Sequence, residues 1–126
     1  MIDKEHLKNL IETDFNTIVD EVLIKEINEI RIILIDKTFL DIWFSLKLKN
    51  RYSCHWERKF KDNTIYRHDN IPHSKWKYVT TFPKHFHNRS EANVEESHIS
   101  EEIIKGTYQF MRFVKESGIV NQNNDY

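Results

Sequence analysis

The chain has 126 residues, which suits one domain with a hydrophobic core, and its aromatic content of 13% argues against intrinsic disorder. Its single cysteine excludes an internal disulfide, its longest aliphatic run is too short to cross a bilayer, and its first residues lack the pattern of a secretory signal. These features predict a soluble cytoplasmic protein that does not associate with membranes.

The formal net charge of −1 hides an uneven distribution of charge along the chain. Residues 1–46 carry 5 basic and 10 acidic side chains, residues 47–89 carry 11 and 3, and residues 90–126 carry 3 and 7, so the net charges are −5, +8 and −4. A basic centre suits a polyanionic partner such as a nucleic acid. It is equally compatible with basic and acidic elements that face each other within the fold.

The first expected element is an amphipathic helix. Asp3 can cap it, and apolar side chains recur at helical spacing from Leu7 to Val22, with charged residues on the other side. From about Glu29 the pattern changes to that of strands. Residues 30–36 are apolar on both faces, as in a strand that is covered on both sides.

Three further expected strands alternate apolar and polar side chains, over residues 39–48, 51–60 and 64–69. Short polar turns separate them, which is typical of an antiparallel meander. Residues 70–80 read as a long loop, and residues 81–87 as an extended segment at an edge or rim.

A polar connector over residues 88–96 leads to the last expected helix, which Ser100 caps and which stops near Gly118. The predicted fold is therefore α+β. It is a twisted antiparallel β-meander of four to five strands, with an N-terminal and a C-terminal α-helix packed on its apolar face. We expect one domain over residues 1–120 and a frayed tail over residues 121–126.

Four of the seven histidines lie within one short stretch of this fold: His68, His73, His85 and His87. Histidine is the side chain whose ordinary pKa lies nearest neutrality. On an extended chain the last two share one face, because successive side chains point to opposite sides. We interpret this stretch as the candidate functional site.

Three kinds of chemistry fit the residues of this stretch. In a phosphodiester cleavage without metal, one imidazole accepts a proton and a second donates one, while a guanidinium binds the phosphate. The same residues suit simple RNA binding, with Trp76, Tyr78 and Phe86 stacking on bases. A metal-dependent enzyme would use His73, His85 and His87 as ligands.

For the first chemistry no cofactor is expected. The predicted catalytic residues are His73, His85, His87 and Asp69, and the predicted substrate- or phosphate-binding residues are Arg67, Asn70, Lys84, His68 and His55. A structural interpretation stays open for each of them, since any single histidine is more often structural than catalytic, and Asp69, Asn70 and Pro72 together are good turn formers.

The stretch also resembles a known family. The runs Arg-His-Asp-Asn-Ile-Pro-His at residues 67–73 and Thr-Phe-Pro-Lys-His-Phe-His at residues 81–87 are similar to the signature of TumE-type toxins of prokaryotic toxin–antitoxin pairs. The family has an aromatic residue in place of His68 and a histidine in place of Lys84. The resemblance implies a toxin with an antitoxin partner of the helix-turn-helix class, and, by analogy with toxins of this size, action on RNA as a ribonuclease. The alternative is a non-catalytic module whose basic face binds RNA or the antitoxin.

Overall fold

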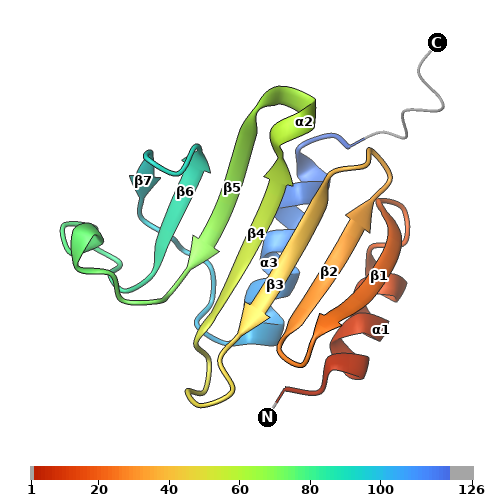
Figure 1. Cartoon of the computed structure of the whole chain (residues 1–126), viewed down its shortest axis with the longest axis horizontal. Coiled ribbons are helices and arrows are strands. Elements are labelled where there is room, and N and C mark those ends of the chain that lie inside the picture. The colour runs from red at the N-terminus through yellow and green to blue at the C-terminus, as the bar shows by residue number, and fades with distance from the viewer. Residues whose placement is uncertain (1, 120–126) are drawn as a thin grey trace.

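A seven-stranded antiparallel sheet forms the centre of the molecule, and its strand order follows the chain from β1 to β7 (Figure 1). The computed structural model describes residues 2–119, so the predicted tail at 121–126 lies outside the described residues. The α+β class and the meander are confirmed, but the predicted number of four to five strands is too low. The strands are β1 (Val19–Glu26), β2 (Glu29–Leu34), β3 (Phe39–Phe44), β4 (Tyr52–Arg58), β5 (Thr64–Asp69), β6 (His85–Arg89) and β7 (Val94–Glu95).

Two longer helices, α1 (Lys4–Asp14) and α3 (Ile103–Glu116), lie against the same face of this sheet (Figure 1). A four-residue helix, α2 (Lys59–Asp62), joins β4 to β5, and a short 3₁₀ helix, η1 (Ser74–Trp76), lies in the loop between β5 and β6. The prediction that the N-terminal and C-terminal helices pack on the sheet is therefore confirmed.

The N-terminal helix is shorter than its apolar spacing suggested. Asp3 caps α1 as predicted, since its carboxylate accepts a hydrogen bond from the His6 backbone N–H at 3.1 Å. The helix ends at Asp14, and the chain then turns into β1. Phe15, Ile18 and Val22 are all buried and happen to continue the helical spacing, although they lie in the turn and on the strand. The predicted extension of the helical stripe to Val22 is wrong for this reason.

The sheet has one buried face, which is packed against the helices, and one open face. Burial alternates strictly along β2 and β3: in β2, Ile30, Ile32 and Leu34 are buried, whereas their neighbours are half-buried. The prediction that residues 30–36 are covered on both sides is therefore wrong. The open face is the one that carries Arg31 and Asp41, which form a bidentate ion pair across β2 and β3.

Two strands end at an earlier residue than the alternation of apolar and polar side chains predicts. β3 stops at Phe44, because the Ser45 hydroxyl accepts hydrogen bonds from two N–H groups that follow it and turns the chain into a loop over residues 45–51. β4 stops at Arg58 and is followed by α2, so Phe60 is fully exposed instead of sharing the buried face. In contrast, two further strands arise within regions that were expected to be partly or wholly irregular: β6 extends to Arg89, and β7 lies in the expected polar connector.

The C-terminal helix begins at a different cap from the predicted one. The Glu102 carboxylate, not Ser100, accepts hydrogen bonds from the first backbone N–H groups of α3. Gly106 lies against β4, where an added Cβ would stand 1.6 Å from the Tyr52 hydroxyl oxygen. A glycine at this position therefore allows the close approach of helix and sheet. That hydroxyl donates a hydrogen bond to the Ser100 carbonyl, which ties the start of α3 to the sheet.

Candidate functional site

The pairing of β5 with β6 brings the candidate residues together. In this register Asp69 lies opposite His85, and Arg67 lies opposite His87. The residue between the two histidines, Phe86, points the other way and packs on the rings of α3. Because side chains alternate along a strand, the four candidates lie on the open face of the sheet.

His85 and His87, here called the histidine pair, lie side by side with their ring centroids 5.1 Å apart. His85 Nδ1 is 2.9 Å from the Pro83 carbonyl oxygen, and His87 Nδ1 is 2.8 Å from that of Glu91. A carbonyl oxygen only accepts, so each Nδ1 carries the proton and donates it. In the neutral rings, each Nε2 is therefore left as the basic atom.

Charged side chains surround the pair. Asp69 Oδ2 is 4.0 Å from His85 Nε2 and 3.6 Å from Arg67 Nε. Arg67 Nη1 reaches the Glu91 carboxylate at 3.4 Å, and the same carboxylate is 3.6 Å from His87 Nδ1. Each histidine thus has one carboxylate nearby, Asp69 at His85 and Glu91 at His87, and Arg67 lies opposite His87 in the strand pairing.

The indole of Trp76, in η1, covers the histidine pair. Its ring centroid is 6.2 Å from that of His85 and 5.8 Å from that of His87, and both histidines are only 2% exposed. His73 lies on the exposed side of this loop, where its ring is 6.3 Å from Trp76 and its Nδ1 accepts a hydrogen bond from the Lys75 N–H. Trp76 thus contacts all three histidines, but His73 is not within the pair.

Burial also sets the protonation of His87. It lowers the pKa of this imidazole from its ordinary value, an effect that the hydrogen bond to the Glu91 carbonyl opposes and the nearby Arg67 charge reinforces. His87 Nε2 is buried and has no hydrogen-bond partner among the described residues. The ring is therefore held neutral near pH 7, with an unoccupied lone pair on Nε2.

Two of the predicted phosphate-binding residues lie on the helix-facing side of the sheet instead. His68 is fully buried, and its Nδ1 is 2.7 Å from the Ser97 hydroxyl. Burial, with smaller effects from Lys84 and His85, lowers the pKa of His68 to about 3. Lys84 donates from Nζ to the Ile99 carbonyl at 3.0 Å. Neither side chain shares a face with the histidine pair.

The two remaining predicted binding residues have different settings. Asn70 is buried, and its side chain bridges the main chain of β4 and the preceding loop: it accepts from the Tyr52 N–H at 2.9 Å and donates to the Asn50 carbonyl. His55 lies on the open face opposite Arg67, with its Nε2 3.2 Å from a Glu57 carboxylate oxygen. His55 thus extends the polar row of the open face, whereas Asn70 holds two loops together.

Sequence reasoning missed one member of the site and one role. Glu91 contacts both Arg67 and His87, but it lies in the turn between β6 and β7, where no sequence pattern marked it. Trp76 was expected to stack on bases. Its position over the histidines depends on the course of the loop between β5 and β6, which no pattern in the sequence predicts. Phe86, also expected to stack on bases, packs in the core.

Among residues 2–119, no group of three or more His, Cys, Asp or Glu side chains is arranged to hold a metal ion. The hypothetical ligand set of His73, His85 and His87 is split by the position of His73. No described helix has the length and apolar character needed to cross a membrane.

Comparison with known proteins links this geometry to one family. The family model described as "TumE: Toxin TumE" matches residues 7–117, which include the whole sheet and all the candidate residues. Neither the curated proteins nor the solved structures gave a match.

Proposed function

Since residues 7–117 match its model, this chain belongs to the TumE toxin family and is a toxin-like component of a toxin–antitoxin system, and we propose that it acts by cleaving RNA without a metal ion, through the histidine pair. The observation that carries the proposal is the arrangement of the pair. Two imidazoles lie 5.1 Å apart, each oriented by a backbone carbonyl, with a guanidinium and a carboxylate beside them.

In the proposed reaction His87 acts as the general base. Its lowered pKa keeps it neutral, and its Nε2 carries a free lone pair. This atom takes the proton from a ribose 2′-hydroxyl, and the 2′-oxygen forms a bond to phosphorus. His85, protonated at Nε2 and facing Asp69 at 4.0 Å, gives its proton to the 5′-oxygen as the bond from phosphorus to that oxygen breaks. The products are a 2′,3′-cyclic phosphate and a 5′-hydroxyl.

Arg67 is the proposed phosphate-binding residue. Its side chain is partly exposed on the open face, opposite His87 and beside Asp69, and its guanidinium can donate to the phosphate oxygens on which charge develops. Its present partners, Asp69 and Glu91, lie at 3.6 and 3.4 Å, so these contacts are loose ion pairs that a phosphate can replace.

Access to the pair requires a movement of Trp76, because the indole leaves both histidines almost fully covered. Tyr78, which is 68% exposed, lies 6.3 Å from Trp76, and Lys75 lies over the indole. A base of the substrate could stack on the rings of Trp76 and Tyr78. This stacking would compensate for the contacts that the indole loses when it moves off the histidines. The substrate class is therefore single-stranded RNA, in which bases are free to stack.

Asparagine variants of the histidines give a matched test of the proposal. Asn retains an N–H donor near the place of Nδ1, so it can keep the hydrogen bond to the carbonyl while it removes Nε2. Wild type, His85→Asn, His87→Asn and His73→Asn would each be expressed in a bacterial host, with growth and total RNA integrity followed. We expect growth arrest and RNA loss with wild type and His73→Asn, and neither with the other two variants.

Arrest that persists in both His85→Asn and His87→Asn would refute the catalytic proposal. It would favour a second candidate, a non-catalytic module that binds RNA. This candidate is supported by the burial of both histidines of the pair. The surface next to them is formed instead by the aromatic and basic side chains of residues 75–78. That module predicts affinity that falls steeply with salt and does not depend on either histidine.

A further inference from the structure

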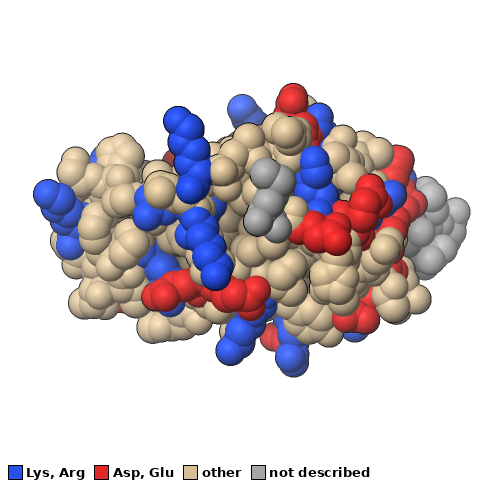
Figure 2. Space-filling model, turned by 90° about the horizontal axis from the view of Figure 1, so that it is seen from below, with Lys and Arg blue, Asp and Glu red and all other residues tan. Residues whose placement is uncertain are grey.

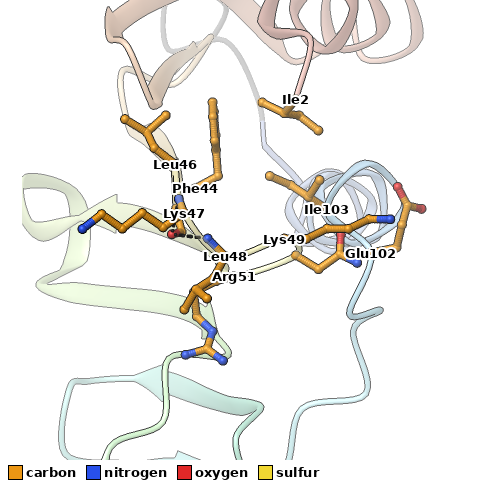
Figure 3. A pocket seen from close by; sticks show the side chains of 11 residues that line it. Ile2, Phe44, Leu46, Lys47, Leu48, Lys49, Arg51, Glu102 and Ile103 are labelled. Atoms are coloured by element: carbon orange, nitrogen blue, oxygen red, sulfur yellow. Dashed lines mark hydrogen bonds between the residues drawn. The ribbon is translucent and has the colours of Figure 1, made fainter.

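A second site lies away from the histidine pair, at the end of the sheet where β3 turns into β4. A pocket of about 640 Å³ opens there between the loop over residues 45–51, the start of α3 and the N-terminal segment. Its apolar lining comes from Ile2, Phe44, Leu46, Leu48 and Ile103. In Figure 3 these side chains stand around one hollow, and they come from three separate parts of the chain. We call this hollow the loop pocket.

The loop that forms one wall exposes apolar surface that the fold does not use. Leu46 is 47% exposed and Leu48 is 55% exposed, although the loop backbone is fixed by two hydrogen bonds to the Ser45 hydroxyl (dashed in Figure 3). Leucines held at the mouth of a hollow are typical of a surface that binds another protein. An RNA strand, whose surface is polar and charged, gains little from such a lining.

The rim of the loop pocket is positively charged. Lys47 and Lys49 alternate with the two leucines, and Arg51 ends the loop; within residues 2–119 none of the three takes part in an ion pair. The one acidic lining residue, Glu102, already accepts hydrogen bonds from the start of α3. Figure 2, which views the molecule from this end, shows basic side chains projecting from the face left of its centre, with acidic side chains both directly below them and to the right.

We infer that the loop pocket is the docking site for the antitoxin, and that it receives an antitoxin segment in which apolar side chains are flanked by carboxylates. The toxin family implies such a partner protein. The chemistry of this segment is chosen to complement the pocket. The apolar lining favours apolar side chains of the partner, and the three basic side chains of the rim favour carboxylates beside them. The inference does not depend on the proposed RNA cleavage, because no member of the histidine pair lines the pocket.

Calorimetric titration with the cognate antitoxin, the product of the gene paired with this one, tests the inference. The first variant is Leu48→Asp, which places a charge on an exposed loop side chain and therefore leaves the core intact. The matched control is Ile27→Asp, since Ile27 is a similarly exposed apolar residue, 63% accessible, in the turn after β1. We expect Leu48→Asp to weaken antitoxin binding at least tenfold and Ile27→Asp to change it less than twofold.

A second variant, Lys49→Glu, reverses one charge of the rim. We expect weaker binding and a smaller dependence of affinity on salt than in wild type. Equal affinity of wild type and Leu48→Asp, an equal loss in Ile27→Asp, or no binding of the antitoxin to wild type would each overturn the inference. Weaker binding of a single-stranded RNA 20-mer by Leu48→Asp, with antitoxin binding unchanged, would also overturn it and assign the pocket to nucleic acid. RNA cleavage by Leu48→Asp should equal that of wild type, which separates this test from that of the histidine pair.

Discussion

Mild acid is expected to destabilise this fold through His68, the buried histidine on the helix-facing side of the sheet. Burial, with smaller effects from Lys84 and His85, lowers the pKa of its imidazole to about 3, compared with an ordinary value of 6.5. As the pH falls below 6.5, the unfolded chain takes up a proton at this position while the folded protein does not. The stabilising contribution of the neutral ring is therefore present above pH 6.5 and is lost progressively down to about pH 3.

The size of this effect follows from the difference between the two pKa values. Each unit of difference corresponds to about 1.4 kcal/mol, so the full loss is about 5 kcal/mol. That is comparable with the whole free energy of unfolding of a typical small domain, about 5–15 kcal/mol. Between pH 7.5 and pH 4.5 His68 alone should remove about 2–3 kcal/mol. The lowered pKa of His87 acts in the same direction.

Urea denaturation at a series of pH values measures this loss, and His68→Asn is the control. The variant keeps a polar group near the Ser97 hydroxyl but has no titrating ring, so its stability should fall by about 2–3 kcal/mol less than that of wild type over the same pH range. Carboxylates contribute equally to both proteins and cancel in the difference. An equal pH dependence in the two proteins, or an NMR titration of His68 near pH 6.5, would refute the reasoning.

Other parts of the structure give three further predictions. Gly106→Ala should lower the free energy of unfolding by about 1–3 kcal/mol, because the added Cβ meets the Tyr52 hydroxyl. Tyr52→Phe in the same chain should restore part of this loss. An unchanged thermal melt of Gly106→Ala would contradict the close packing of helix and sheet. Trp76→Ala should make His87 react faster with diethyl pyrocarbonate, as followed by mass spectrometry, and an unchanged rate would show that the indole is not its cover. Asn70→Ala removes hydrogen bonds to two backbone groups and should cost about 1–3 kcal/mol in urea denaturation, whereas a cost below about 0.5 kcal/mol would argue against its bridging role.

The strands were predictable wherever one face is buried and the other is not. In β3 and β4 the period of two identifies the buried side chains correctly, including Leu40, Ile42, Cys54 and Trp56. The same rule fails at the strand ends. Leu48 and Phe60 continue the alternating pattern but lie in a loop and in α2, where hydrogen bonds within the turn outweigh the burial of one more apolar side chain.

β1 could not be recognised from its pattern because it is an edge strand with a single buried side chain, Val22. Its pairing with β2 contains two register shifts, which interrupt the alternation that would mark a strand. β7 has only two residues, too few to show any periodicity. The strand count was therefore underestimated at both edges of the sheet, where burial is least complete.

The candidate site was predictable in part. The two-residue spacing of His85 and His87 predicts that they share a face, and the pairing of β5 with β6 places Arg67 and Asp69 across from them. His68 is also a histidine, but it lies between Arg67 and Asp69 on β5. Its side chain therefore points to the opposite face, into the core. His73 lies in a loop, where the sequence gives no period from which its direction can be read.

Incubation of the purified protein with a single-stranded oligoribonucleotide tests the central claim most directly. The products should end in a 2′,3′-cyclic phosphate, form equally well in the presence of a chelator, and be absent with His87→Asn and with a substrate whose 2′-hydroxyl is removed at the cleavage site. Cleavage by His87→Asn at the wild-type rate, or cleavage that a chelator abolishes, would contradict a metal-independent mechanism through the histidine pair.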